Sequence, residues 1–368
     1  MPNPSPKRRS TVDERAIIRE FESAQDRLVL QAADLSLETL ATMVETGAID
    51  TGPVYQRRER WRADKQSALI ESFLLNVPVP PIYLAESDYG VYSVIDGKQR
   101  LTSIRAFMRD ELALSHLEKL RDLEGARFRD LPRALANALQ VRPYLRVVTL
   151  LRQSDPDLKY EVFTRLNTGG EPLNAQEIRN VVYRGPLNDL VYELAQHPFL
   201  LRQLKIGGPR SQAYRNMQDA EWVLRFLTLL ENWKSFSGEL ARSIDGFMAT
   251  HQEAPPALLQ EFREDFTIAI DACQAIWGRY AFQRPFGSGW RDQALAGMYD
   301  TQMIGAAQLT GSEITLLIGL RTEVVKETRK LFEDAQFEDA VRVGTNTPNR
   351  VRYRIEKMAD ALRRVIDA

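Results

Sequence analysis

Cysteine and histidine are scarce in this 368-residue chain, which has one cysteine, Cys273, and three histidines, His116, His197 and His251. A single cysteine excludes an internal disulfide and a cysteine-based metal cluster. The histidines form no HxxxH pair, so a histidine metal centre is not expected. No apolar run reaches the roughly 18 residues that span a bilayer, and the basic N-terminus lacks the apolar stretch of a secretory signal. We therefore expect a cytoplasmic protein with no membrane partner.

An excess of one charge is also missing, because 49 Lys and Arg residues face 50 Asp and Glu residues. This balance excludes a histone-like protein and one that binds nucleic acid through a basic tail, although an average can hide a basic face. The composition, 44% hydrophobic and 27% charged, is that of a globular protein with enough apolar material for a core. The length predicts two or three domains.

The order of the predicted elements divides the chain into an α/β part and a helical part. Residues 1–15 are rich in proline, serine and arginine, so we place a disordered tail at 1–20. Strand and helix patterns alternate up to about residue 185, and nearly every segment after residue 219 has helical spacing. We therefore predict an α+β protein with a small α/β domain at 21–185 and a mainly helical domain at 186–368.

Hydrophobic spacing and turn residues define the individual elements. Strands are expected at 27–33, 82–84, 91–95 and 146–151, and helices at 35–47, 63–76 and 158–166. Loops at 207–209, 255–256 and 285–289 separate the helices of the second half, which include 220–233, 258–280 and 314–332. Asn174 and Glu177 have the spacing of a capping box at the start of another helix.

The sequence Asp96-Gly97-Lys98-Gln99-Arg100 is the strongest chemical signal, because it stands between a predicted strand and a predicted helix. The first amides and the dipole of that helix attract an anion, and Gly97 permits the close approach of a phosphate. Arg100 is suited to hold phosphate oxygens bidentately, and Lys98 adds a positive charge. Asp96 is suited to cap the helix or to bind a divalent cation. An ordinary Asp-Gly turn followed by surface residues explains the same pattern without a ligand.

Two further groups of residues are candidates for contacts to a nucleotide or a phosphate. The first group is Tyr55, Gln56, Arg57 and Trp61. Its aromatic, amide and guanidinium groups can stack a base and bind a phosphate, but packing of the aromatic rings between a helix and a sheet explains them as well. In the second group, Arg165 and Asn167 supply polar side chains beside the glycine pair at 169–170.

Basic residues are concentrated near the C-terminus, where residues 341–364 contain seven Lys or Arg and two acids, a net charge of +5. The sequence GTNT at 344–347 precedes a predicted helix whose start can contact phosphates. Arg350, Arg352 and Arg354 on this helix are therefore candidate contacts for nucleic acid. A solvated terminal helix explains the same charges.

Five motifs in order resemble one bacterial family, the GmrSD-type N-terminal domain with a ParB/sulfiredoxin-like core. The motifs are YQRRERW (55–61), PVPPIYL (78–84), VIDGKQRLTSI (94–104), VFTRLNTGGEPLNAQEIRN (162–180) and GTNTPNRVRYRI (344–355). They cover most of the chain from about residue 25 to residue 360. The resemblance implies a ParB-like domain at 21–185 that carries the DGKQR motif, followed by the helical domain with its basic C-terminal helix.

The resemblance also implies a function in bacterial defence against phage, including restriction of modified DNA. In several members a DGQQR-type motif supports nucleoside triphosphate (NTP) hydrolysis coupled to DNA sensing. Carried over to this chain, Asp96, Gln99 and Arg100 are the implied catalytic residues. An NTP with Mg²⁺ is the implied ligand, with Asp96 as the metal-binding residue. Gly97, Lys98, Arg100 and the two further groups named above would contact the nucleotide.

The chain departs from the family pattern in two places. Lys98 stands where glutamine is most often found, which strengthens the attraction of phosphate and removes an amide. Restriction members often carry a second, HNH-type nuclease domain that needs a histidine base and a metal site, whereas the last histidine here is the isolated His251. We therefore expect the sensing and nucleotide-handling part alone, with DNA and a partner nuclease or defence-complex subunit as partners. The resemblance leaves a homodimer open.

Several functions stay open at this point. The first is an NTP-binding and NTP-hydrolysing, DNA-associated module of a restriction-like defence system. A non-catalytic nucleic-acid-binding or sensor subunit would use the same motif to hold a phosphate. A ParB-like, metal-dependent DNA nickase would use Asp96, and an interaction scaffold in a multi-subunit complex would need no chemistry at the motif.

Overall fold

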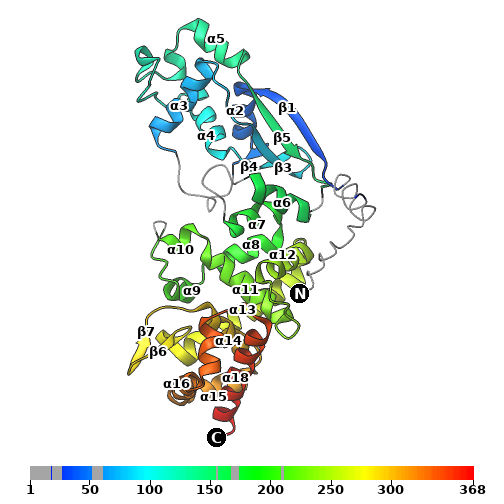
Figure 1. The fold of residues 1–368 in the computed structure, drawn as a ribbon, viewed down its shortest axis with the longest axis vertical. Coiled ribbons are helices and arrows are strands. Elements are labelled where there is room, and N and C mark those ends of the chain that lie inside the picture. The colour runs from blue at the N-terminus through cyan, green and yellow to red at the C-terminus, as the bar shows by residue number, and fades with distance from the viewer. Residues whose placement is uncertain (1–17, 19–26, 52–60, 155, 167–173, 209–210) are drawn as a thin grey trace, which may run out of the picture. The chain divides into compact units, whose positions relative to one another are not determined.

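The computed structural model describes residue 18 and residues 27–51, 61–154, 156–166, 174–208 and 211–368 (Figure 1). All but one residue of the tail expected at 1–20 lie outside the described residues. The chain divides into two compact units. The first contains the described residues up to Leu166, and the second contains those from Asn174 to Ala368.

A five-stranded mixed sheet forms the centre of the first unit. Its strands, in spatial order, are β1 (Leu30–Ser36), β5 (Tyr144–Leu150), β3 (Ile82–Asp88), β4 (Val91–Asp96) and β2 (Ile49–Asp50). The pairs β1–β5 and β3–β4 are antiparallel, whereas β5–β3 and β4–β2 are parallel. A mixed sheet in one unit and a largely helical second unit make the protein α+β, as predicted.

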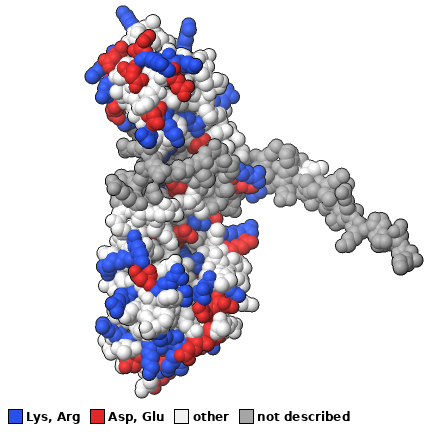
Figure 2. Space-filling view, turned by 60° about the vertical axis from the view of Figure 1, so that its left-hand side comes forward, with Lys and Arg blue, Asp and Glu red and all other residues white. Residues whose placement is uncertain are grey.

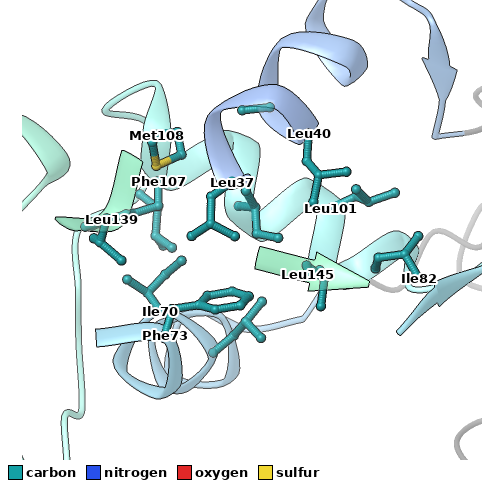
Figure 3. Packing of buried hydrophobic residues seen from close by; sticks show 14 of the residues in the cluster. Leu37, Leu40, Ile70, Phe73, Ile82, Leu101, Phe107, Met108, Leu139 and Leu145 are labelled. Carbon is teal, nitrogen blue, oxygen red and sulfur yellow. The ribbon is translucent and has the colours of Figure 1, made fainter. Parts of the chain in front are cut away.

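Helices cover the sheet and close a hydrophobic core. They are α2 (Leu37–Glu45), α3 (Ala63–Leu74), α4 (Lys98–Met108) and α5 (Arg133–Val141), and α6 (Pro156–Leu166) completes the unit. Figure 3 shows Leu37 and Leu40 of α2, Ile70 and Phe73 of α3, and Leu101 of α4 packed together beside the strands. Since these side chains recur every three or four residues on their helices, hydrophobic spacing was sufficient to predict α2, α3 and α4.

A buried carboxylate fixes the loop that follows α4. Glu71 of α3 is only 6% exposed and accepts the backbone N–H groups of Glu118, Lys119 and Leu120 at 3.1, 2.7 and 2.8 Å. These hydrogen bonds favour the charged form and therefore hold the pKa of Glu71 below its ordinary value. The hydrogen bond from Leu120 has the largest effect. The ionised carboxylate therefore replaces the partners that this loop does not find in a helix or strand.

The second unit is built from helices. They are α7 (Ala175–Val182), α8 (Pro186–Leu194), α9 (Pro198–Gln203), α10 (Gln212–Arg215), α11 (Gln218–Asn232), α12 (Leu240–His251), α13 (Pro256–Trp277), α14 (Ala296–Ala307), α15 (Gly311–Gly319), α16 (Arg321–Lys330), α17 (Ala335–Arg342) and α18 (Pro348–Ile366). Ten consecutive residues of α14 are buried, so this helix lies in the core of the unit. None of the helices in the described part of the chain is both long and apolar enough to cross a membrane.

Two local predictions in the second unit are wrong. The helix expected at 314–332 is divided into α15 and α16 at Leu320, whose φ of −104° and ψ of 25° leave the helical region directly after Gly319, a poor helix former. The segment expected as a loop at 285–289 belongs to a hairpin of β6 (Arg284–Phe286) and β7 (Gly289–Arg291). The short strands of this hairpin give too few residues for an alternating pattern to be detected.

Replacing the buried carboxylate should destabilise the first unit in a pH-dependent way. Glu71→Gln is expected to lower the free energy of unfolding by about 1–3 kcal/mol near pH 7, because one amide oxygen cannot satisfy three backbone donors. The folded-state pKa of Glu71 is lowered, so its contribution is present above the unfolded-state pKa and is lost as the pH falls through the folded-state value. Denaturant unfolding at pH 7 and at about pH 3 should therefore show a difference from wild type that shrinks in acid.

The control for this experiment is Glu118→Gln, which changes an exposed carboxylate in the same loop. Its unfolding free energy should stay close to that of the wild type at both pH values. A Glu71→Gln difference that is as large in acid as at pH 7 would contradict the role assigned to the ionised carboxylate.

Candidate functional site

A glycine with a positive φ joins β4 to α4. β4 ends at Asp96, Gly97 has φ 99° and ψ 11°, and α4 begins at Lys98, with the N–H of Leu101 donating to the Gly97 carbonyl at 2.9 Å. A Cβ atom on Gly97 would lie 2.3 Å from Cδ1 of Ile82. Both the backbone conformation and the close approach of β3 therefore require glycine at this position. The N-cap of α4 is therefore Gly97 and not Asp96, which the sequence had suggested as a cap.

Arg100 connects the end of β4 to the segment before β3. Its Nη2 donates to Oδ2 of Asp96 at 2.7 Å, and its Nη1 donates to the Pro80 carbonyl at 2.7 Å. The Arg100 side chain is 10% exposed, whereas the Asp96 side chain is 41% exposed. The guanidinium thus faces acceptors within the protein. The sequence had suggested instead that it is open to phosphate oxygens. Asp96 is the accessible member of the pair.

Gln99 brings the start of α3 to the start of α4. Its Oε1 accepts the backbone N–H of Trp61, two residues before α3, at 3.0 Å. The half-buried Trp61 ring packs against the core of the first unit, which agrees with the packing interpretation of this residue. This hydrogen bond joins the N-terminal ends of the two helices; the first turn of α4 contains Lys98 and no acid, whereas the first turn of α3 contains Asp64. The N-terminal end of α4, with its first amides and Lys98, is the part of this arrangement that favours an anion.

The other predicted nucleotide contacts are placed less completely. Tyr55, Gln56, Arg57 and Asn167 lie outside the described residues. Arg165 is exposed in the last turn of α6 and forms an ion pair with Glu161, four residues earlier. The described contacts thus bring together Asp96, Gly97, Gln99, Arg100 and Trp61.

The beginning of α7 is fixed by the predicted capping box. The Asn174 side chain accepts the N–H of Glu177, and the Glu177 side chain accepts the N–H of Asn174. One turn later, Arg179 is buried and its Nε donates to Oδ1 of Asp245 at 2.7 Å. No local pattern in the sequence indicates this partner, because Asp245 lies on α12, 66 residues away.

Arg354 is not a surface contact for nucleic acid, and its prediction as one is wrong. It is 0% exposed and forms an ion pair with Asp300 of α14, which Arg225 of α11 also binds. Nη1 of Arg354 donates to the carbonyls of Ala340 and Thr345 at 2.8 and 2.7 Å. A buried carboxylate and backbone carbonyls thus keep this guanidinium in the core, since a buried charge needs partners.

The two neighbouring arginines of α18 are also engaged with the protein. Arg350 donates to the carbonyl of Val343, and Arg352 donates to Oδ1 of Asn349 at 2.6 Å. Both side chains are half-buried. Their hydrogen bonds hold the loop before α18 and the first turn of this helix.

The described residues around the Gly97 turn contain no dense cluster of metal ligands. Within the described residues, no three His, Cys, Asp or Glu side chains are grouped so as to hold a metal ion. Mg²⁺ in nucleotide sites often takes only one or two carboxylates, with substrate phosphates and water as its other ligands. Asp96, with its partly exposed carboxylate, fits that requirement.

One known family matches the part of the chain that contains the Gly97 turn. Residues 37–184 match the family described as GmrSD restriction endonuclease, N-terminal domain. The match supports the resemblance to the GmrSD-type N-terminal domain for these residues, and with it a module of a restriction-like defence system, whereas the motif at 344–355 lies outside the matched range. Neither a curated protein nor a solved structure matches the chain.

Two glycine substitutions should separate the cost of backbone strain at positive φ from the cost of insufficient space for a side chain at Gly97. Gly97→Ala is expected to cost about 2–4 kcal/mol of unfolding free energy, because alanine is strained at positive φ and its Cβ overlaps Ile82. Gly90→Ala is the matched control: Gly90 has φ 72° but nothing within 4 Å of an added Cβ. It should cost only about 1 kcal/mol.

The double variant Gly97→Ala/Ile82→Val removes the Cδ1 atom that meets the new methyl group. Its loss of unfolding free energy, measured by denaturant titration, should be smaller than the sum of the losses of the two single variants. Equal losses for Gly90→Ala and Gly97→Ala, with no recovery in the double variant, would show that space is not limiting at Gly97.

Because two buried arginines share one buried carboxylate, removing the carboxylate should cost more unfolding free energy than removing one arginine. Asp300→Asn should lower the unfolding free energy by about 3–5 kcal/mol, because two buried guanidinium groups lose their common carboxylate. Arg354→Met should cost less, because it leaves one carboxylate paired with Arg225. Arg352→Ala on the same helix is the control and should cost about 1 kcal/mol or less. A larger loss for Arg354→Met than for Asp300→Asn, measured by denaturant unfolding, would contradict this account.

Proposed function

We propose that the first unit binds an NTP at the Gly97 turn and hydrolyses it, and that the chain does so as a DNA-associated module of a restriction-like defence system. The observation that carries the proposal is the hydrogen bond that joins the N-terminal ends of α3 and α4, next to a left-handed Gly97 after which the first amides of α4 have no acceptor in their own helix. The family of this domain, described as restriction endonuclease, supports the link to DNA.

The chemistry of a triphosphate suits this turn. The first amides of α4 have no acceptor within the helix and point towards its N-terminal end. Lys98, half-exposed in that turn, adds a positive charge near the phosphates. Phosphoryl transfer depends mainly on positioning and on neutralising charge, so amides, a lysine and a helix dipole are suitable groups.

The remaining residues of the turn have separate roles in this proposal. Asp96 is the catalytic carboxylate, which orients the attacking water and contributes to holding Mg²⁺ when the nucleotide is bound. When present, Mg²⁺ supplies charge neutralisation at the phosphates. Arg100 acts through Asp96, because its hydrogen bond fixes the direction of that carboxylate, and it is a positioning residue. Gln99 positions Trp61 through the backbone of that residue.

A second function, nucleotide binding without turnover, is favoured by the ion pair itself. Nη2 of Arg100 lies 2.7 Å from Oδ2 of Asp96, so this carboxylate oxygen is already engaged within the protein. A sensor that binds NTP and changes its partners would need the phosphate site but not a reactive carboxylate. The two functions differ in whether bound NTP is consumed.

The test measures binding and turnover in the same set of variants of the full chain. Calorimetry with a nonhydrolysable NTP should show Lys98→Ala binding about 10- to 100-fold more weakly, because a charge-assisted contact is lost. Radiolabelled NTP turnover, with and without DNA, should fall at least 100-fold in Asp96→Ala. Arg100→Ala should lower turnover more than binding, and Arg100→Lys should restore part of it.

The matched control is Arg105→Ala, which changes a cation on the same helix that pairs with Glu111. It should bind and hydrolyse NTP like the wild type. Wild-type turnover in Asp96→Ala would sink the catalytic proposal, and binding by Asp96→Ala and wild type without any turnover would establish the sensor instead. Wild-type affinity in Lys98→Ala would place the nucleotide elsewhere.

A further inference from the structure

The β6–β7 hairpin of the second unit carries a basic and aromatic surface. Residues 278–295 contain three arginines, Arg279, Arg284 and Arg291, and a single acid, Asp292, which pairs with Lys205 at 2.9 Å. The antiparallel strands place Arg284 opposite Arg291. Figure 2 brings forward the side of the molecule that carries β6 and β7 in Figure 1, and it shows Lys and Arg side chains together with Asp and Glu side chains and uncharged surface in this unit. The segment therefore has a local positive charge in a nearly neutral chain.

Aromatic rings and guanidinium groups alternate at the base of the hairpin. The rings of Tyr280 and Trp290 are stacked, with centroids 5.4 Å apart and planes 26° apart. The guanidinium carbon of Arg279 lies 4.9 Å from the centre of the Tyr280 ring, and that of Arg329 lies 5.5 Å from the centre of the Trp290 ring. These distances are typical of cation–π contacts, which keep the guanidinium groups over the rings.

The tip of the hairpin is held in place from α16. Arg329 donates hydrogen bonds to the carbonyls of Gly287, Ser288 and Gly289 at 3.1, 3.1 and 2.7 Å. One guanidinium thus fixes three consecutive carbonyls of a turn that has few other partners. A hairpin of this length is not stable alone, so Arg329 preorganises it as a rigid projection.

Two side chains on this rigid hairpin are presented to solvent. The Phe286 side chain is 66% exposed, with the guanidinium carbon of Arg284 6.0 Å from the centre of its ring. Arg291 is exposed and has no ion-pair partner among the residues that the structure describes. By contrast, the arginines of α18 are directed to carbonyls, an amide and a buried carboxylate. The hairpin is thus better suited to an external polyanion than α18 is.

We propose that the β6–β7 hairpin is a contact surface for single-stranded DNA, with Phe286 stacking on a base and the exposed Arg291 binding a phosphate, whereas Arg284 is 14% exposed and faces Glu338 at 3.9 Å. An exposed aromatic ring and an exposed arginine on the same hairpin match a strand with free base faces and one phosphate per nucleotide. In duplex DNA the base faces are stacked on each other and are not available to Phe286. The proposal rests on the DNA association in the proposed function and assigns it to a site outside the NTP-binding unit.

The experiment measures the binding of a fluorescein-labelled 20-nucleotide DNA of mixed sequence to the full chain by fluorescence anisotropy. The same sequence as a duplex and as RNA gives two comparison arms. Phe286→Ala should weaken binding of the single strand about 5- to 100-fold, because one stacking contact is lost. Arg291→Ala should reduce the slope of log K against log salt by about 0.7, the value for one phosphate of a single strand.

Matched controls lie on the same unit. Arg242→Ala removes an 85% exposed guanidinium from α12, and Ile268→Ala shortens an apolar side chain of α13 that is 52% exposed. Both should bind the single strand like the wild type, and thermal unfolding should show that all four variants are folded.

Several results would overturn the proposal. They are the absence of single-strand binding by the wild type, tighter binding of the duplex or of RNA, and equal affinities of wild type, Phe286→Ala and Arg291→Ala. Each of these leaves NTP binding and its dependence on Lys98 unchanged, so the failure of the hairpin proposal is distinguishable from that of the nucleotide site. Conversely, a protein that binds single-stranded DNA through the hairpin but does not hydrolyse NTP would contradict the nucleotide proposal and leave the hairpin proposal standing.

Discussion

The positive φ of Gly97 is the constraint on which the arrangement of the first unit depends. The chain leaves β4 and enters α4 through this one residue, and β3 approaches so closely that a methyl group would overlap Ile82. If α4 began one residue later, its face would turn by about 100°, and Leu101 and Ile104, both fully buried, would leave the core. The same turn therefore determines the packing of α4 and the direction of its first amides.

Arg100 shows how one side chain serves both stability and the site. It was predicted from its residue type to bind a phosphate, but its partners are the Asp96 carboxylate and the Pro80 carbonyl. The Asp96 contact is local, because Asp96 ends β4 and Arg100 lies four residues later in the first turn of α4. The contact with Pro80 depends on how β3 and β4 pair, which no local pattern in the sequence contains. Local spacing therefore predicted the motif, whereas strand pairing decided how Arg100 is used.

The same distinction explains which parts of the fold were predictable. Helices α2 and α3 and strands β3 and β4 follow from hydrophobic spacing and turn residues, and the observed elements lie within a few residues of the expected ones. The strand order and the two-residue strand β2 depend on contacts between distant segments, so the sequence alone did not define them. Within the site, the motif at Gly97 could be recognised, but the hydrogen bond from Trp61 to Gln99 joins residues 38 apart.

The C-terminal helix shows that a charge count must be combined with periodicity. Val351, Ile355 and Met358 recur at helical spacing and are buried, and Arg354 stands on the same face. A second signal was Asp300, the one charged residue in α14, a helix otherwise made of apolar and small polar residues. An arginine on the apolar face of one helix and an isolated acid in another predict a buried pair, because each needs a partner out of water. Positive charge near the C-terminus is therefore partly used inside the protein. It follows that exposure and partners, more than the number of arginines, determine where this nearly neutral chain can attract a polyanion.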